Sequence, residues 1–138
     1  MHLHDWIGTP YRLGGRDRSG IDCLGITRVA LEDLGVPEAL RPDPWATVCD
    51  AWAAGGAPAA LAASGFPPGW SMLEGVPFEA PPDGAVAVGR IDCAPRGGGI
   101  GVGALRDGLL WTAAPTFGVV AIPWYRVRST IAAVWVLR

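Results

Sequence analysis

The sequence contains no lysine, so all 11 of its basic residues are arginine, against 13 acidic residues and a formal net charge of -2. Four of the arginines, at positions 12, 16, 18 and 28, lie close together in the sequence, but acidic residues alternate with them. Such a pattern indicates a solvated face with local ion pairs. Because the sequence has no continuous basic stripe, we expect no nucleic-acid partner.

Long apolar runs are missing as well. No run reaches the roughly 18 residues that a membrane span requires, so no membrane span is predicted. The first twelve residues, MHLHDWIGTPYR, have no basic segment followed by an apolar segment. We therefore expect no secretory signal peptide and synthesis in the cytoplasm.

Potential metal ligands are few and scattered. His2 and His4 are the only histidines, and the three cysteines, Cys23, Cys49 and Cys93, are widely spaced and include no CxxC pair. This composition predicts reduced thiols, no zinc or other metal site, and no cofactor.

The sequence is rich in apolar residues and in turn formers. Half of its 138 residues are hydrophobic and seven are tryptophan, which predicts a globular domain with a substantial core. The tryptophans are scattered over every predicted element, so we expect core and interface packing rather than a sugar-binding platform. We find neither an internal repeat nor a long linker, and therefore predict a single domain over residues 1–138.

The predicted elements are helices first and strands afterwards. Asp22 is a good N-cap for a helix from Cys23 to about Leu34, which Gly35 would close. Residues 1–65 are expected to be mainly helical, with a helical turn over 2–8 and further helices over 43–53 and 58–64. We expect a loop over 11–21 and an irregular segment over 66–83. A sheet is expected over 84–138, with strands at 85–88, 100–105, 109–112, 119–122 and 131–137. A turn at 106–108 would join the second strand to the third. This order predicts an α+β fold.

The residues most suited to chemistry lie in two short segments, GTPYRLGG at 8–15 and GIDCLG at 20–25. Cys23 falls in the first turn of the predicted helix, where unpaired N–H groups and the macrodipole favour an anion, and reactive thiols so placed have pKa values of roughly 3.5 to 7.5. The preceding glycines allow close approach of a substrate and can present N–H donors to an oxyanion. The pattern indicates a nucleophile position.

These two segments resemble the NlpC/P60 family, papain-like cysteine peptidases that cut the peptide stems of bacterial cell walls. The family pattern is G-x-P-Y-x-x-G-G followed by G-x-D-C-x-G. The resemblance implies that Cys23 is the nucleophile position, that Tyr11 faces it, and that Asp22 is the residue before it. It also implies a papain-like fold with N-terminal helices packed on an antiparallel sheet of about five strands. PDGAV at 82–86 and GIGV at 99–102 resemble the family's strand starts P-G-D-x-V and H-V-G-I.

The sequence departs from this family at the general base. The histidine of H-V-G-I corresponds to Gly99, and the polar third residue corresponds to Trp111 or Thr112, with Thr112 standing where H-A is common. No other alignment supplies a base, because no histidine follows His4. A thiol nucleophile requires a base within hydrogen-bond reach and a proton donor for the leaving amine, so we expect very low activity.

Each of these residues also has a simpler, structural interpretation. With its base missing, Cys23 is expected to be a small buried hydrophobe, as cysteines outside disulfides usually are. His2 and His4 are expected to be solvated terminal residues rather than substitutes for the base. Cys49 is expected in the core, and no role is assigned to Cys93.

The resemblance and the missing base favour one function over two others. Cys-Leu-Gly in place of the commoner Cys-Ser-Gly, and the ending from Gly118 to Trp135, resemble versions of the family from tailed bacteriophages and gene transfer agents. The first hypothesis is therefore a catalytically silenced structural component of a phage-like tail, located in the virion with other tail proteins as partners. The alternatives are an active cell-wall endopeptidase that uses Cys23, and a module that only binds peptidoglycan fragments.

Overall fold

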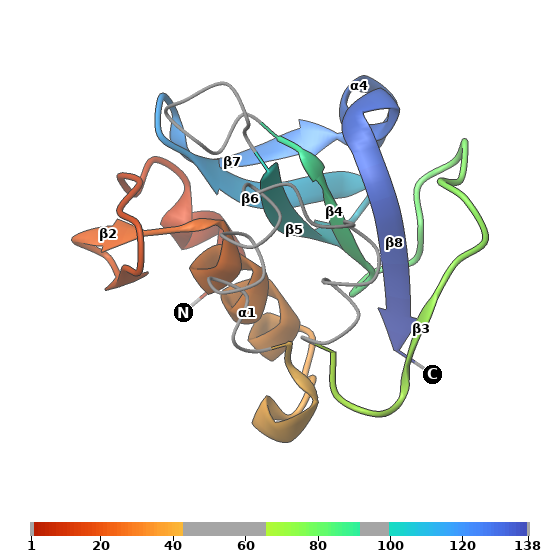
Figure 1. The fold of residues 1–138 in the computed structure, drawn as a ribbon. Helices are drawn as coiled ribbons and strands as arrows, with labels where there is room; N and C mark the ends of the chain where they lie inside the picture. The colour runs from red at the N-terminus through yellow and green to blue at the C-terminus, as the bar shows by residue number, and fades with distance from the viewer. Residues whose placement is uncertain (1, 43–65, 92–99, 138) are drawn as a thin grey trace.

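In the computed structural model, the described residues are 2–42, 66–91 and 100–137. Two sheets and one long helix dominate them (Figure 1). The larger sheet has six strands in the order β3-β8-β4-β5-β6-β7, and every neighbouring pair is antiparallel. Its strands are β3 (Trp70–Met72), β4 (Val86–Arg90), β5 (Ile100–Arg106), β6 (Leu109–Ala114), β7 (Gly118–Pro123) and β8 (Ile131–Leu137). The smaller sheet pairs β1 (Arg16–Asp17) with β2 (Gly20–Ile21).

The helix α1 (Cys23–Asp33) packs against β5 and β6, so the predicted α+β class is confirmed. Its buried side chains include Ile26, Ala30 and Leu31, none of which has any exposed surface. The helix ends as its sequence predicts. Gly35 has a φ of 82°, and the N–H groups of Gly35 and Val36 donate to the carbonyls of Glu32 and Leu31, both at 2.9 Å. This double hydrogen bond is a Schellman motif.

The expectation of about five strands was wrong by one. The sixth strand is β3, which lies in the segment predicted to be irregular and pairs with β8 at the edge of the sheet. Three residues are too few to show an alternating pattern, and their partner strand lies more than sixty residues away in sequence. The other five strands lie within one or two residues of their predicted bounds.

The N-terminal part contains less regular helix than the sequence predicts. Besides α1, its described residues form only two short 3-10 helices, η1 (Leu3–Trp6) and η2 (Glu38–Leu40). The hairpin of β1 and β2 falls in the segment predicted to be a loop. The helices predicted over 43–53 and 58–64 lie outside the described residues, as do Cys49, Cys93 and Gly99.

Short local elements connect the strands of the C-terminal half. The hairpin of β5 and β6 turns on Asp107 and Gly108, whose φ values of 55° and 76° are those of a two-residue type I′ turn. Between β7 and β8 lie the short helix α4 (Trp124–Val127) and the 3-10 helix η3 (Arg128–Thr130), which the sequence did not predict.

Of the five tryptophans among the described residues, four are buried, as expected of core residues: Trp6, Trp111, Trp124 and Trp135. Within the described ranges, no helix is long and apolar enough to cross a membrane. The same ranges hold no group of three or more His, Cys, Asp or Glu side chains that could bind a metal ion.

Candidate active site around Cys23

Cys23 is the first residue of α1 and is 8% exposed. Its position follows from the preceding residue, because Asp22 is extended (φ -98°, ψ -178°) and caps the helix. One turn later, the hydroxyl of Thr27 donates to the carbonyl of Cys23 at 2.7 Å. The sulfur therefore belongs to a first helical turn that is fixed from both sides.

The carboxylate of Asp22 accepts hydrogen bonds at both of its oxygens. Oδ1 accepts from the backbone N–H of Gly25 at 2.8 Å and from Nη1 of Arg16 at 2.7 Å, and Oδ2 accepts from the N–H of Gly14 at 2.8 Å. Asp22 is only 3% exposed. Its carboxylate therefore joins the glycine-rich loop, the β1 strand and the helix end, and this is a structural task. The sequence predicted the cap but not the bond to Arg16.

Tyr11 is held beside the strand that leads to the cysteine. It forms a parallel bridge with Ile21, and the flanking bonds run from the N–H of Arg12 to the carbonyl of Ile21 (3.2 Å) and from the N–H of Ile21 to the carbonyl of Pro10 (3.0 Å). The tyrosine ring is half-buried and packs against the core. This backbone pairing places Tyr11 beside Ile21, two residues before Cys23. Residues 10–12 and 21–23 therefore form one unit, called the Cys23 unit below.

The glycines of the motif are required by close packing inside this unit. A Cβ at Gly25 would lie 2.5 Å from Cγ1 of Ile21 and 3.0 Å from the carbonyl oxygen of Gly15. A Cβ at Gly15 would collide with the backbone carbonyl of Gly20. Heavy atoms are not found so close in folded proteins, so larger residues would force the loop away from the helix. The spacing of these glycines serves the fold, whether or not the thiol reacts.

The predicted third residue, Thr112, lies on β6 and is fully buried. Its hydroxyl donates to the carbonyl of Val102 on the neighbouring strand β5 at 2.9 Å. Trp111 and Thr112 are consecutive in the strand and therefore project to opposite faces of the sheet. The indole N–H of Trp111 is buried and has no hydrogen-bond acceptor in the described structure. Gly99, at the predicted base position, precedes β5 and lies outside that part of the chain.

His4 is exposed, as expected of a residue near the terminus, but its ring contacts Trp111 edge-on, with the ring centroids 5.2 Å apart and the planes at 83°. The backbone N–H of His2 donates to the carboxylate of Asp5 at 3.2 Å. The contact of His4 with Trp111 is not predictable from the sequence alone.

Beside this unit, the tip of the β1–β2 hairpin carries an acid with a lowered pKa. The hydroxyl and the backbone N–H of Ser19 donate to the carboxylate of Asp17 at 2.5 and 2.8 Å and hold the pKa of Asp17 below its ordinary value of 3.8. Both bonds favour the ionised carboxylate and therefore stabilise the folded state. This contribution to folding stability is fully present above pH 3.8 and is lost as the pH falls through the lower pKa that Asp17 has in the folded state.

We expect the substitution Ser19→Ala to raise the titration midpoint of Asp17 toward 3.8, because the stronger of the two donors is removed. Carboxyl carbon shifts measured by NMR between pH 2 and 6 would give the midpoint in both proteins. An unchanged midpoint would show that the Ser19 hydroxyl does not hold the carboxylate.

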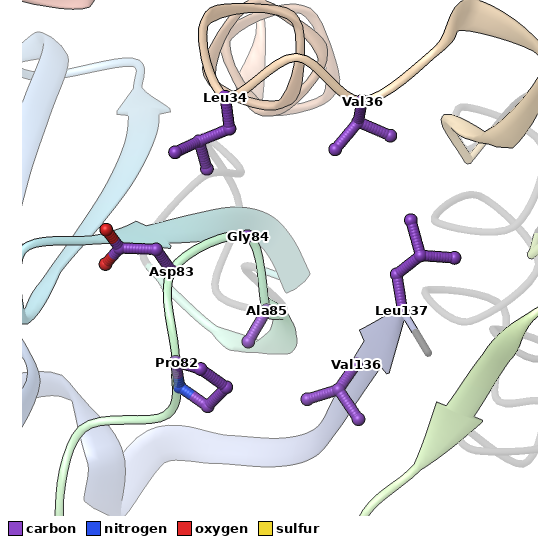
Figure 2. A pocket seen from close by; sticks show the side chains of 8 residues that line it. All are labelled: Leu34, Val36, Pro82, Asp83, Gly84, Ala85, Val136 and Leu137. Carbon is purple, nitrogen blue, oxygen red and sulfur yellow. The ribbon is translucent and has the colours of Figure 1, made fainter.

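A pocket of about 320 Å³ lies at the other end of α1 (Figure 2). Leu34 and Val36 line it from the helix end, and Val136 and Leu137 line it from β8, while the carboxylate of Asp83 points away from its centre. An 11-residue helix is ~16 Å long at 1.5 Å per residue, so this apolar pocket is separate from the Cys23 unit.

A buried cysteine in the first turn of a helix that packs on an antiparallel sheet is the arrangement expected of a papain-like α+β fold. The solved NlpC/p60 domain of the peptidoglycan hydrolase SagA has this fold, with a TM-score of 0.54, 19% identity, and coverage of 98% of this chain and 92% of that domain. At this identity the likeness shows the fold, and the chain has the NlpC/P60 fold.

The sequence similarity to curated proteins is local. Probable endopeptidase NlpC of Escherichia coli (strain K12) is 52% identical over 31 residues, which are 22% of this chain and 20% of that protein. The match therefore spans about a fifth of the relative. No known family profile matches the sequence.

Proposed function

We propose that this chain is a member of the NlpC/P60 family that has lost catalysis and serves as a structural component of the distal tail of a phage-like particle. One observation carries the proposal: Cys23 is kept at the first turn of α1, yet the sequence contains no histidine after His4 and places Gly99 where the family has its base. Glycine has no side chain that could accept a proton.

The chemistry explains why this loss is severe. Cleavage of a peptide bond requires a base that activates the thiol and an acid that protonates the departing amine, and one imidazole serves both purposes in such enzymes. The carboxylate of Asp22 is buried and already accepts three hydrogen bonds, so it is poorly placed to replace that imidazole. Without the base, orders of magnitude in rate are lost.

The presence of the family motif in this chain is compatible with the loss of catalysis, because its residues have structural tasks. Asp22 and the glycines at 15 and 25 hold the loop against the helix through the contacts described above. A chain that no longer cleaves peptides still requires these residues in order to fold. The sequence can therefore keep the signature of the family after the reaction is gone.

The place in a phage-like tail is supported by sequence likeness to the tail-associated versions of the family, in Cys23-Leu24-Gly25 and in the ending from Gly118 to Trp135. In this role the partners are other tail proteins, and the site of action is the virion. Peptidoglycan, the material that enzymes of this family cut, is proposed as a further partner.

The second candidate is an active cell-wall endopeptidase that uses Cys23. The local identity to Probable endopeptidase NlpC favours it, together with the fold that the chain shares with a peptidoglycan hydrolase. It requires a base other than the family's histidine.

Turnover of a cell-wall peptide separates the two candidates. We expect the purified chain and its Cys23→Ala variant to release the same background amount of product from peptidoglycan stem peptides, measured by mass spectrometry. In particles that contain the chain, Cys23→Ala is expected to leave assembly and infectivity within a factor of about two, because the thiol does no chemistry.

The control is the alkylation rate of the thiol with iodoacetamide near neutral pH, followed by intact mass. Slow alkylation is expected because Cys23 is only 8% exposed and the sequence has no histidine at the position of the family's base. Turnover that depends on Cys23, together with rapid alkylation, would contradict the loss of catalysis and establish the endopeptidase.

A further inference from the structure

Two aromatic side chains, Phe78 and Tyr125, are each 74% exposed, although aromatic rings of this size are usually at least partly buried. They belong to segments far apart in sequence, the loop before β4 and the helix α4. Arg128 links them. Its guanidinium lies over the ring of Phe78, 4.0 Å from the ring centroid, and it follows Tyr125 by three residues in one helical segment, which makes the two side chains neighbours.

The backbone beneath this cluster is fixed. Trp124, which is 3% exposed, donates its indole N–H to the carbonyl of Pro77 at 3.1 Å and so ties the loop of Phe78 to α4. The hydroxyl of Thr130 donates to the carbonyl of Val127 at 2.8 Å and closes the helical segment on its far side. The backbone segments that carry the two rings are therefore held together before binding, which lowers the entropy cost of ordering them on binding.

The guanidinium of Arg128 has no hydrogen bond or ion pair with any residue that the structure describes, in contrast to those of Arg16 and Arg106, which pair with Asp22 and Asp33. A guanidinium that stacks by its face keeps its N–H groups at the edge, in the plane where a carboxylate binds in a two-pronged manner. Arg128 is also half-buried. Folding has therefore already removed part of its hydration, which lowers the free energy of desolvation when a partner binds.

From these observations we propose that Phe78, Tyr125 and Arg128 form a docking surface for an acidic segment of a partner protein. An Asp or Glu carboxylate of the partner pairs with Arg128, and the neighbouring apolar side chains of the partner cover the two rings. Exposed aromatics beside an arginine are the composition in which binding hot spots are enriched. None of these three residues belongs to the Cys23 unit, and the proposal goes beyond the proposed function because it holds whether or not the thiol reacts.

A pair of peptides tests the carboxylate requirement on the full chain. We would measure fluorescence anisotropy with fluorescein-labelled GLEELG and with GLQQLG, in which the two acids are replaced by their amides. The acidic peptide is expected to bind at least tenfold more tightly. Arg128→Gln is expected to weaken its binding at least tenfold, whereas Arg126→Gln, at an exposed neighbour without an aromatic partner, should change it less than twofold.

Three outcomes would overturn the proposal. Equal binding of the two peptides would show that a carboxylate of the partner is not required. Equal losses for Arg128→Gln and Arg126→Gln would show that the peptide is attracted non-specifically by positive charge. Binding of a soluble muropeptide that requires Arg128, without binding of the acidic peptide, would assign the surface to cell-wall material instead of a protein. Because the amide peptide tests the same point with the unchanged chain, a folding defect in Arg128→Gln cannot hide the answer.

Discussion

Replacing Asp22 with alanine is expected to lower the free energy of unfolding by about 3 kcal/mol, far more than an ordinary surface substitution. The helix cap contributes about 1 kcal/mol, and hydrogen bonds to a charged group contribute about 1.5–3 kcal/mol each. The total stays moderate because Arg16, the ionic partner, has 42% of its side-chain surface exposed and is solvated after the change. Thermal unfolding followed by circular dichroism should show a melting temperature lower by about 10 °C.

Asp17→Ala is the matched control for this prediction. It removes a carboxylate from the same loop, but one that is exposed and is bonded chiefly to the neighbouring Ser19. Its effect on the melting temperature should be that of an ordinary surface substitution, a small fraction of the loss expected for Asp22→Ala. Similar losses in the two variants would contradict the assignment of Asp22 as the joint between the loop and the helix.

The second large loss of stability is expected at Gly15, and its neighbour Gly14 serves as the control. Gly15→Ala places a methyl group against the backbone carbonyl of Gly20 and within 2.9 Å of the carbonyl oxygen of Arg12. Neither of these is a flexible side chain, so the loop itself has to move. Overpacking costs about 1–3 kcal/mol where side chains can adjust, and we expect at least the upper end of that range here. Urea unfolding followed by tryptophan fluorescence would measure it.

Gly14→Ala is the neighbouring control, because its Cβ would meet no atom within 4 Å. Its φ of 77° lies in the left-handed region, so alanine costs about 1–2 kcal/mol there from backbone strain alone. The loss at Gly15 is therefore expected to exceed the loss at Gly14. The reverse order would show that the contact with the carbonyl of Gly20 is not what requires a glycine at position 15.

Local sequence signals were reliable where one short segment carried all the information. The cap at Asp22 and the glycine stop at Gly35 set the bounds of α1 to within a residue, because both act through backbone groups of the same helix. The two-residue turn at Asp107 and Gly108 was likewise predictable, since few residues tolerate a positive φ.

Signals failed where the partner lies far away in sequence. Strand β3 is recognisable only by its hydrogen bonds to β8, and the four residues of α4 are too few to show a helical period. The salt bridge of Arg16 with Asp22 was one of several pairings that the alternating charges of that loop allowed. The contact of His4 with Trp111 joins a residue near the N-terminus to a strand a hundred residues later.

The sequence alone determined the α+β order, the position of Cys23 at the start of a helix, and the absence of any histidine after His4, because each depends on residue identity and local backbone preference. Only the tertiary structure decided that the carboxylate of Asp22 is occupied by three donors, and that the guanidinium of Arg128 lies over the ring of Phe78, fifty residues earlier in the sequence. Contacts of this kind depend on how distant segments are folded together, and spacing along the chain does not specify that geometry.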